Sequence, residues 1–481
     1  MLQFSKKFVT ASQEYSTYTK HIPAPLFRRA FTLKSAPTKA ELRITGLGFY
    51  ELFVNGVRLT KGLLAPYISN PDDIVYFDDY DLTPYLCEGE NVIGVCLGNG
   101  MQNPFVYVWN FHEAKFLSAP KLAFYFEAEA GGETVSFEAD SCLVTESAIL
   151  YDSLRSGVHY DASKTHDGWS EKGYDEEGWR APFKAEMPRG DFKICHADPI
   201  KITEERNARS VRPCERTDRK PFKTNQDHFY DKGLKAVEKI PEKNGFLYDF
   251  GLNDAGTLRL CIKGAKKGQR IDILTGERID GDGKFDHTTI SSFYPEYYAQ
   301  RIIYYCRGGE KEEIFVPPFA FFGFRYAFVC GITEEQAVPS LLTYLVAHGD
   351  MKERGAFTCS DKMANTLFDM TLRSDLSNFF FFPTDCPHRE KNGWTGDASI
   401  SAEHMMFTFA AENNFREWLS NVRYAQNIEG ALPGIVPTAG WGFAWGNGPA
   451  WDSVIVNLPY YVYLFRGDKK IILENAHAIM R

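Results

Sequence analysis

The sequence predicts a multidomain α and β protein in which two N-terminal β-sandwich domains are followed by the first part of a helical domain. Length is the first reason, because 481 residues are too many for one hydrophobic core and about three domains are expected. The second reason is a change of period, from short alternating segments with turn signals to helical spacing after residue 360. We therefore expect domains at 1–196, 197–345 and 346–481.

The first of these domains carries the alternation of half-buried strands. Residues 40–45 (Ala-Glu-Leu-Arg-Ile-Thr) alternate with period two, and residues 91–97 form another strand-like run. Within 50–59, Asn55 and Gly56 separate two such runs, and this pair favours a hairpin because both positions tolerate positive φ. Many short strands joined by turns predict a β-sandwich.

The second domain begins with a segment that has little periodicity. Residues 197–244 are rich in Lys, Arg, Glu and Pro, and we interpret them as a linker with some strand content. Further strand-like runs follow from Phe246 onwards, at 257–263, 270–274, 301–306 and 324–329, with a turn at 281–283. They predict a second β-sandwich that ends near residue 345.

Helical spacing replaces the strand pattern after Ser360, which is suited to be an N-cap. Met363, Leu367 and Met370 recur at intervals of four and three, which predicts a helix with an apolar face. Helical spacing continues at 398–425, with a break expected near 413–414, and at 470–481.

Composition excludes several classes of function. A formal net charge of -9 argues against a nucleic-acid partner, and no apolar run approaches the roughly 20 residues of a membrane span. The ten cysteines form neither a CxxC pair nor a zinc-like spacing, so we expect reduced thiols, no structural metal and no cofactor. The N-terminal residues lack an apolar run typical of a signal peptide, and we expect a cytoplasmic protein. Aromatic residues make up 15% of the chain, which fits either large β-sheet cores or a sugar-binding surface.

Chemistry concentrates in residues 383–397, Pro-Thr-Asp-Cys-Pro-His-Arg-Glu-Lys-Asn-Gly-Trp-Thr-Gly-Asp. Its prolines and glycines prevent a continuous helix, so a loop is expected between two helices. The loop holds three carboxylates, an arginine and a tryptophan, a set that suits the recognition of sugar hydroxyls and of an apolar sugar face. Glycoside hydrolysis requires one carboxylic acid to protonate the leaving oxygen and a second carboxylate as base or nucleophile. The residues alone also fit a solvated surface turn with local ion pairs.

The string at 385–391, followed by Gly393 and Trp394, resembles the signature of bacterial α-L-rhamnosidases, glycoside hydrolase family 78. Other stretches resemble the two β domains of that family, at 50–56, 91–100, 160–161, 168–169, 249–253 and 322–326. The resemblance covers roughly residues 40–481. It implies that the helices are the first part of an (α/α)6 barrel that is truncated at the end of this chain.

The resemblance also implies roles within the loop. Glu390 matches the general acid, Asp385, Arg389 and Asp397 match residues that bind rhamnose hydroxyls, and Trp394 matches a residue lining the sugar subsite. Family members act with inversion, using a water activated by a second carboxylate. That carboxylate is a glutamate farther along the family's barrel, so the general base is expected to be missing from this chain. Asn392 is a departure, because an apolar residue is common there in the family.

A second candidate is the Gly-rich segment at 440–452. Family barrels use aromatic residues after the acid motif to frame rhamnose, which makes Trp441, Trp445 and Trp451 candidates for the same role. Packing between helices is the alternative for each of them. Asp452 can hold a sugar hydroxyl or cap a helix, and we assign it to the site.

The expected function is a glycoside hydrolase that releases terminal α-L-rhamnose, with inversion, from small-molecule or oligosaccharide rhamnosides. A homodimer is compatible with the sequence, which does not fix the oligomeric state. Two alternatives remain open from the residues: a non-catalytic carbohydrate-binding protein, and a glycosidase of related architecture with another sugar preference.

Overall fold

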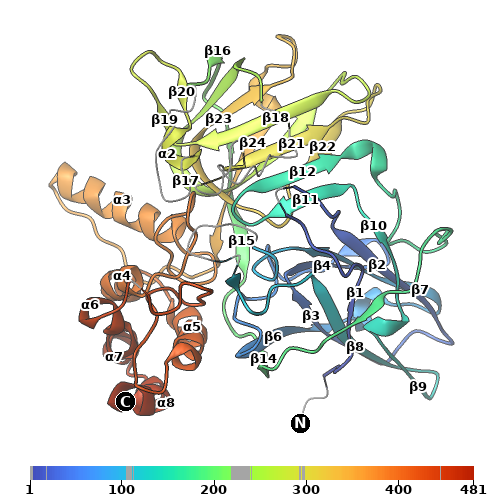
Figure 1. Ribbon diagram of the computed structural model, residues 1–481, viewed down its shortest axis with the longest axis horizontal. Coiled ribbons are helices and arrows are strands. Elements are labelled where there is room, and N and C mark those ends of the chain that lie inside the picture. The colour runs from blue at the N-terminus through green and yellow to red at the C-terminus, as the bar shows by residue number, and fades with distance from the viewer. Residues whose placement is uncertain are drawn as a thin grey trace.

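A computed structural model describes residues 4–17, 19–104, 111, 113–217, 239, 241–291, 294, 298–444 and 446–481. The described chain forms three parts, a β-sandwich at the lower right of Figure 1, a second β domain above it and a helical domain at the lower left. This arrangement confirms the expected order of β-rich domains followed by a helical C-terminal domain.

Two antiparallel-rich sheets form the first sandwich. One is seven-stranded, in the order β13-β1-β8-β3-β6-β14 with β9 paired to β8, and its strands are β1 (Phe8–Thr10), β3 (Lys39–Leu47), β6 (Ile74–Asp81), β8 (Lys121–Ala130), β9 (Glu133–Glu138), β13 (Phe183–Ala185) and β14 (Asp191–Ile194). The other is five-stranded, in the order β10-β2-β7-β4-β5, and its strands are β2 (Pro25–Leu33), β4 (Phe49–Val54), β5 (Val57–Arg58), β7 (Gly89–Gly98) and β10 (Leu143–Glu146). Leu42, Ile44, Leu52 and Phe124 are fully buried between the sheets. The expected hairpin joins β4 to β5, with φ of 48° at Asn55 and 84° at Gly56.

The second β domain is built on one ten-stranded sheet, in the order β11-β12-β21-β18-β23-β17-β24-β15, with β16 and β22 also paired to β17. Its strands are β11 (Ile149–Ser153), β12 (Gly157–Asp161), β15 (Ile200–Asn207), β16 (Ser210–Glu215), β17 (Asn244–Ile262), β18 (Arg270–Gly276), β21 (Arg301–Tyr305), β22 (Glu313–Phe315), β23 (Phe322–Cys330) and β24 (Leu342–Gly349). A small hairpin, β19 (Arg278–Ile279) with β20 (Phe285–Asp286), and the short helix α2 (Thr288–Ser291) complete it.

Some strands of this sheet lie outside residues 197–345, the interval expected for the second domain. Strands β11 and β12 lie within 1–196, yet β12 pairs in parallel with β21 and so belongs to the second sheet. Strands β15 and β16 come from the expected linker, which confirms its strand content, whereas 218–238 and 240 lie outside the described residues. The chain therefore reaches the second domain once, returns to β13 and β14 in the first sandwich, and then enters the second domain again.

The helical domain contains α3 (Lys362–Ser377), α4 (Thr395–Thr408), α5 (Glu412–Ala425), α6 (Pro449–Asp452), α7 (Val454–Arg466) and α8 (Lys469–Met480). The break between α4 and α5 falls a few residues before the expected one. The N-cap of α3 is Asp361 and not Ser360, because the Asp361 carboxylate accepts hydrogen bonds from the backbone N–H groups of Met363 and Ala364. Helix α7 was not expected, since Pro459 lies inside an apolar run without clear helical spacing. Within the described ranges, no helix is both long and apolar enough to cross a membrane.

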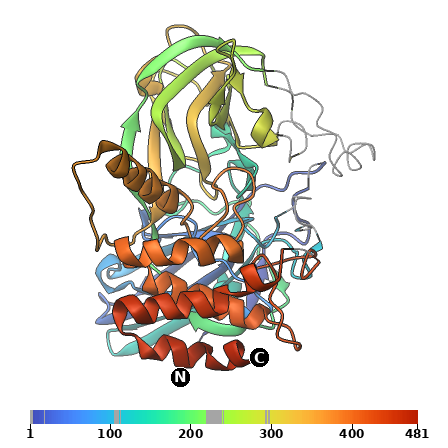
Figure 2. The ribbon, with the colours of Figure 1, turned by 90° about the vertical axis from the view of Figure 1, so that its left-hand side faces the viewer.

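The helices differ sharply in how much they bury. Helix α5 places Phe415, Trp418, Leu419 and Val422 in the main core, each fully buried. Helix α3, which projects at the left of Figure 1, has no buried residue. The apolar face expected for α3 is open to solvent, with Met363, Leu367 and Met370 exposed by 66%, 56% and 59%. Figure 2 shows α3 lying apart from the stacked helices below it.

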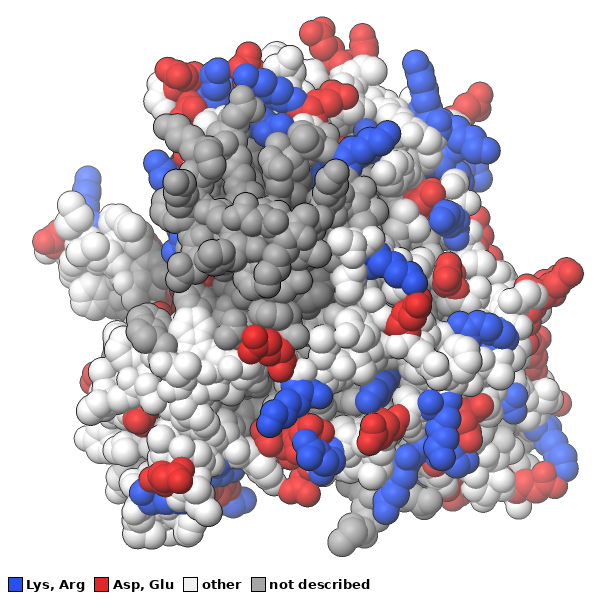
Figure 3. Space-filling model, viewed as in Figure 1, with Lys and Arg blue, Asp and Glu red and all other residues white. Residues whose placement is uncertain are grey.

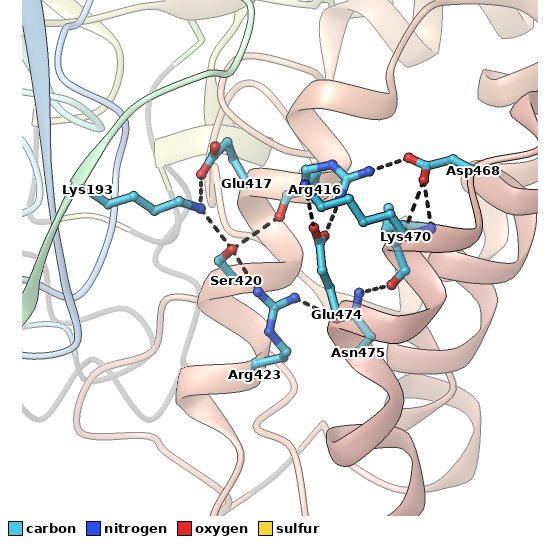
Figure 4. A network of polar contacts seen from close by, with 10 residues as sticks. Lys193, Arg416, Glu417, Ser420, Arg423, Asp468, Lys470, Glu474 and Asn475 are labelled. Atoms are coloured by element: carbon cyan, nitrogen blue, oxygen red, sulfur yellow. Dashed lines mark hydrogen bonds and ion pairs between the residues drawn. The ribbon is translucent and has the colours of Figure 1, made fainter.

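Polar contacts tie the helices to the first sandwich (Figure 4). Lys193 of β14 donates to the carboxylate of Glu417 on α5 at 2.6 Å and to the hydroxyl of Ser420 at 3.0 Å. Glu417 is 1% exposed. On the far side of α5, Arg416 pairs with Asp468, the N-cap of α8, and with Glu474 within α8. Helix α5 is thus held between the β-sandwich and α8.

Candidate active site

The loop between α3 and α4 is anchored by four consecutive phenylalanines, residues 379–382, which are all buried. Phe380 stacks on Phe321 of the second β domain, with ring centroids 3.6 Å apart. Phe382 stacks on Trp418 of α5 at 5.8 Å. The loop therefore starts from a fixed point between the second β domain and the helices.

Residues 385–392 form a closed turn in which Asp385 is hydrogen-bonded to Asn392. The backbone N–H of Asp385 donates to the carbonyl of Asn392, and the N–H of Asn392 donates to Asp385 Oδ1, both at 3.2 Å. Lys391 has a φ of 56° and its N–H donates to the carbonyl of Cys386 at 3.1 Å. The Cys386 thiol donates to Asp385 Oδ2 at 2.9 Å and accepts from the N–H of Glu390 at 3.4 Å. Cys386 thus links the two carboxylate-bearing residues of the turn.

Glu390 has a direct partner within the motif. The indole Nε1–H of Trp394 donates to Glu390 Oε2 at 2.9 Å. Trp394 is 6% exposed, and the ring of Trp441 meets it edge-on with centroids 6.1 Å apart. The structure therefore places Trp394, which was expected to line the sugar subsite, where it orients the carboxylate of Glu390.

The carboxyl group of Asp385 holds its proton more tightly than an ordinary aspartic acid. Burial, with a further contribution from the charge of Glu390, raises the pKa of Asp385 to about 8. Loss of hydration also raises the pKa of Asp397, in the first turn of α4, and of Asp452 in α6. The loop thus keeps a proton next to Glu390 at neutral pH.

The aromatic segment after α5 closes on the same loop. The indole of Trp451 lies over Gly396, because a Cβ at Gly396 would come within 2.6 Å of the indole Nε1 atom. This Nε1 atom is buried without a hydrogen-bond partner. Asp452 accepts a hydrogen bond from the N–H of Gly448 at 3.3 Å, which is the local capping role left open for it. Trp441 and Trp451 thus both contact the loop, whereas Trp445 lies outside the described residues.

Several residues that hold the loop carried no signal in the sequence. Arg155, in the turn between β11 and β12, donates through Nε to the carbonyl of Glu390 at 2.6 Å and through Nη2 to Asn392 Oδ1 at 2.5 Å. Tyr294 donates its hydroxyl hydrogen to the carbonyl of Arg389. A polar residue at position 392 is thereby explained, because Asn392 is 2% exposed and its side-chain oxygen binds Arg155. Arg155 lies 235 residues before Glu390, so no spacing could point to it.

The side chain of Lys391 points away from solvent and into the β domains. It is 5% exposed, and its ammonium group donates to the carbonyls of Leu154, at 2.8 Å, and of Phe321. Burial, together with the charge of Arg155, lowers the pKa of Lys391 well below its usual range. Lys391 therefore belongs to the contact between the loop and the β domains.

Three family models match the chain in succession. The alpha-L-rhamnosidase N-terminal domain matches residues 35–204, the bacterial alpha-L-rhamnosidase concanavalin-like domain matches residues 239–348, and the bacterial alpha-L-rhamnosidase 6 hairpin glycosidase domain matches residues 352–481. The loop at 385–397 and the Trp-bearing segment at 440–452 fall in the last of these.

Individual relatives agree with the family models. An alpha-L-rhamnosidase of Formosa agariphila is 26% identical over 98% of this chain and 48% of its own length, and one of Streptomyces avermitilis is 28% identical over 92% and 40%. Among solved structures, an alpha-L-rhamnosidase from "Dictyoglumus thermophilum" has a TM-score of 0.83 at 26% identity, covering 98% of this chain and 50% of its own. The Streptomyces avermitilis enzyme complexed with L-rhamnose has a TM-score of 0.81 at 25% identity, covering 96% and 41%. The chain spans less than half the length of the curated relatives that it matches.

Proposed function

The chain belongs to the bacterial α-L-rhamnosidase family, glycoside hydrolase family 78, and on that premise we propose that it releases terminal α-L-rhamnose from small or oligosaccharide rhamnosides. The observation that carries the proposal is the loop at 385–397, where the Trp394 indole N–H donates to Glu390 Oε2 and the Cys386 thiol links Glu390 to Asp385. The rhamnose complex of the Streptomyces avermitilis relative supports rhamnose as the sugar.

In the proposed reaction Glu390 is the general acid and acts from its protonated form, because a carboxylate has no proton to donate. It donates a proton to the glycosidic oxygen while the bond from this oxygen to C1 breaks, so the aglycone leaves as a neutral alcohol. A water molecule attacks C1 from the opposite face and gives up a proton to a second carboxylate, which makes the reaction inverting. We assign that base to no residue of this chain.

The sugar contacts proposed for the site come from both ends of the loop. Asp397 would accept hydrogen bonds from rhamnose hydroxyls, Asp385 would bind a hydroxyl through its protonated carboxyl group, and Arg389 would donate to hydroxyl oxygens. Trp441 and Trp451 offer flat rings next to the loop for the apolar face and the methyl group of rhamnose. Asp452 is half-buried and its Oδ1 atom already binds a backbone N–H, so only its second oxygen is proposed for the sugar.

We further propose that the helices are part of an (α/α)6 barrel. The matching family model describes a six-hairpin domain. Several apolar side chains of the helical domain are strongly exposed, with Ile400 at 82%, Leu473 at 75% and Met480 at 80%. Figure 3 shows that the face over these helices, at the lower left, carries few charged side chains. Such a face is where neighbouring hairpins of a barrel would pack.

The direct test is release of p-nitrophenol from p-nitrophenyl α-L-rhamnoside, with the β-anomer as control. The proposal expects release from the α-anomer alone, and NMR of the first product should show β-L-rhamnose before mutarotation. Absence of release would reject the proposal. An α-configured first product would reject inversion only.

A further inference from the structure

The main chain at Glu390 is held from outside the helical domain. Arg155 comes from the turn between β11 and β12, and its guanidinium group is buried, with the residue 2% exposed. Three of its nitrogens have partners around the loop: Nε binds the carbonyl of Glu390, Nη2 binds Asn392 Oδ1, and Nη1 lies 3.4 Å from the sulfur of Met101. A planar group with donors in fixed directions can hold two acceptors at a set separation.

A second basic side chain makes the reverse connection. Lys391, one residue after Glu390, reaches from the loop into the β domains and binds the carbonyl of Leu154 at 2.8 Å, next to Arg155 in the chain, and that of Phe321. The turn at 154–155 and the loop at 390–392 therefore exchange donors in both directions. Two buried basic side chains at one contact are costly unless their donors are satisfied, so this arrangement resists sliding of the loop against the β domains.

Glu390 is thereby held at two points, its carboxylate and its main-chain carbonyl. Its carboxylate accepts from the Trp394 indole at 2.9 Å, and its own carbonyl accepts from Arg155 at 2.6 Å. Between these points only side-chain torsions remain free. A displacement of about 1 Å at a reacting group can cost about 100-fold in rate, so the second hold bears directly on proton donation.

We propose that Arg155 is a positioning residue for Glu390, through which the β domains set the place of the acid. Arg155 does not touch the substrate in this proposal. The inference rests on the proposed function for its kinetic consequence, but the contact between Arg155, Glu390 and Trp394 can be tested without turnover.

The first test is spectroscopic. The Trp394 indole N–H resonance can be followed in protein labelled with ¹⁵N-tryptophan and assigned by its absence in Trp394→Phe. Arg155→Met should shift or broaden this resonance, and Arg155→Lys, which keeps the charge and one donor to the Glu390 carbonyl, should move it less. An unchanged Trp394 resonance in Arg155→Met would overturn the proposal, and if that variant does not fold, Arg155→Lys decides by the same criterion.

The matched control is Arg28→Met. Arg28 is also buried, at 1% exposed, and also holds main-chain carbonyls, those of Trp169 at 3.1 Å and Glu171 at 2.9 Å, but within the first sandwich. Its substitution should lower stability and disturb the indole signal of Trp169 while leaving that of Trp394 in place. A shift of the Trp394 signal in both variants would show a merely structural role and contradict the proposal.

The second test is the dependence on the leaving group. In a form active on p-nitrophenyl α-L-rhamnoside, Arg155→Met should lower kcat on an alkyl α-L-rhamnoside about 10- to 100-fold and on the p-nitrophenyl substrate far less, with little change of KM. Equal losses on both substrates would contradict acid positioning. If the parent releases no p-nitrophenol at all, the proposed function fails while the spectroscopic result still decides the role of Arg155.

Discussion

On the side that faces the β domains, the loop at 385–397 is buried and bonded, whereas its last carboxylate, that of Asp397 at the start of α4, is exposed. Lys391 and Asn392 are 5% and 2% exposed, and both bind residues of the β domains. Asp397 is exposed, and Asp452 is half-buried. The difference separates two parts of the loop, because the buried part fixes the main chain at Glu390 and the exposed carboxylate of Asp397 is accessible to solvent.

The same contrast holds for whole elements. Helix α5 lies against the first sandwich and buries its apolar residues, whereas α3 buries none. Contact with the β domains does not by itself bury a helix, because α3 also contacts β17 and β24 of the second β domain. Each prediction below tests one side of this contrast.

The largest effect is expected at the acid. Glu390→Gln should lower kcat on an alkyl α-L-rhamnoside by about 10²- to 10⁴-fold, because the amide cannot donate the proton that the leaving oxygen needs. The loss on a p-nitrophenyl rhamnoside, whose leaving group needs little protonation, should be much smaller. Glu429→Gln, at an exposed turn residue, is the control for the same chemical change. Similar losses on both substrates would remove Glu390 from the role of acid.

The two partners of the ion pair between the first sandwich and α5 should differ in how much stability is lost when each is replaced. Lys193→Met leaves the carboxylate of Glu417 buried without its cation, and we expect the free energy of unfolding to fall by about 2–4 kcal/mol. Glu417→Gln leaves Lys193, which is about one third exposed, able to reach water, and should cost about 1 kcal/mol. Urea unfolding measures both. A larger loss in Glu417→Gln would show that the buried side of the contact has been misidentified.

The raised pKa of Asp385 predicts that the stability of the protein depends on pH. Its pKa is about 8 in the folded protein against 3.8 in an ordinary aspartic acid, so the folded state binds more protons between these values. The stability linked to Asp385 is therefore fully present below about pH 4 and is lost as pH rises towards 8, by about 1.4 kcal/mol for each pH unit at most. Asp385→Asn should remove this loss, so its advantage in urea over the parent should grow from pH 5 to pH 8. Asp369→Asn, on the exposed face of α3, controls for the change of charge, and an advantage independent of pH would refute the assignment.

The smallest effect is expected on the open face of the helices. Ile400→Glu should change the free energy of unfolding by no more than about 0.5 kcal/mol, because the side chain is 82% exposed. Phe415→Ala, on the packed side of α5, should cost about 3–5 kcal/mol. A loss of more than about 2 kcal/mol in Ile400→Glu would mean that this face is covered in solution, either by a second copy of the chain or by further helices.

The fold could be predicted where the signal is local. The strands at 40–45 and 91–97 and the Asn55-Gly56 hairpin are confirmed, because alternation and turn chemistry act between close neighbours in sequence. The pairing of β12 with β21 was not predicted, since nothing in a strand's own sequence names its partner in a sheet. The spacing of Met363, Leu367 and Met370 predicted an apolar face correctly but said nothing about whether another surface covers it.

In the site, too, the local features could be predicted from the sequence and the long-range contacts could not. The carboxylates of the loop were found because they are contiguous and because the motif resembles a known family. Their roles towards a sugar stay predictions. The structure places Trp394 against Glu390, a contact across four residues that spacing allows but does not require. Arg155 was missed because a contact over 235 residues depends on how the β domains dock, which the motif does not encode.

Calorimetric titration of the chain with L-rhamnose, with D-rhamnose as a control of equal polarity, tests most directly whether the loop at 385–397 forms the sugar site. The enantiomer has the same hydroxyl groups and methyl group but presents them in mirror-image positions, so a shaped site should distinguish the two. The account predicts saturable binding of L-rhamnose alone, weakened about 10-fold or more in Asp397→Asn, whose exposed position makes loss of folding an inadequate explanation. Equal binding of both enantiomers, or full binding of L-rhamnose by Asp397→Asn, would contradict it.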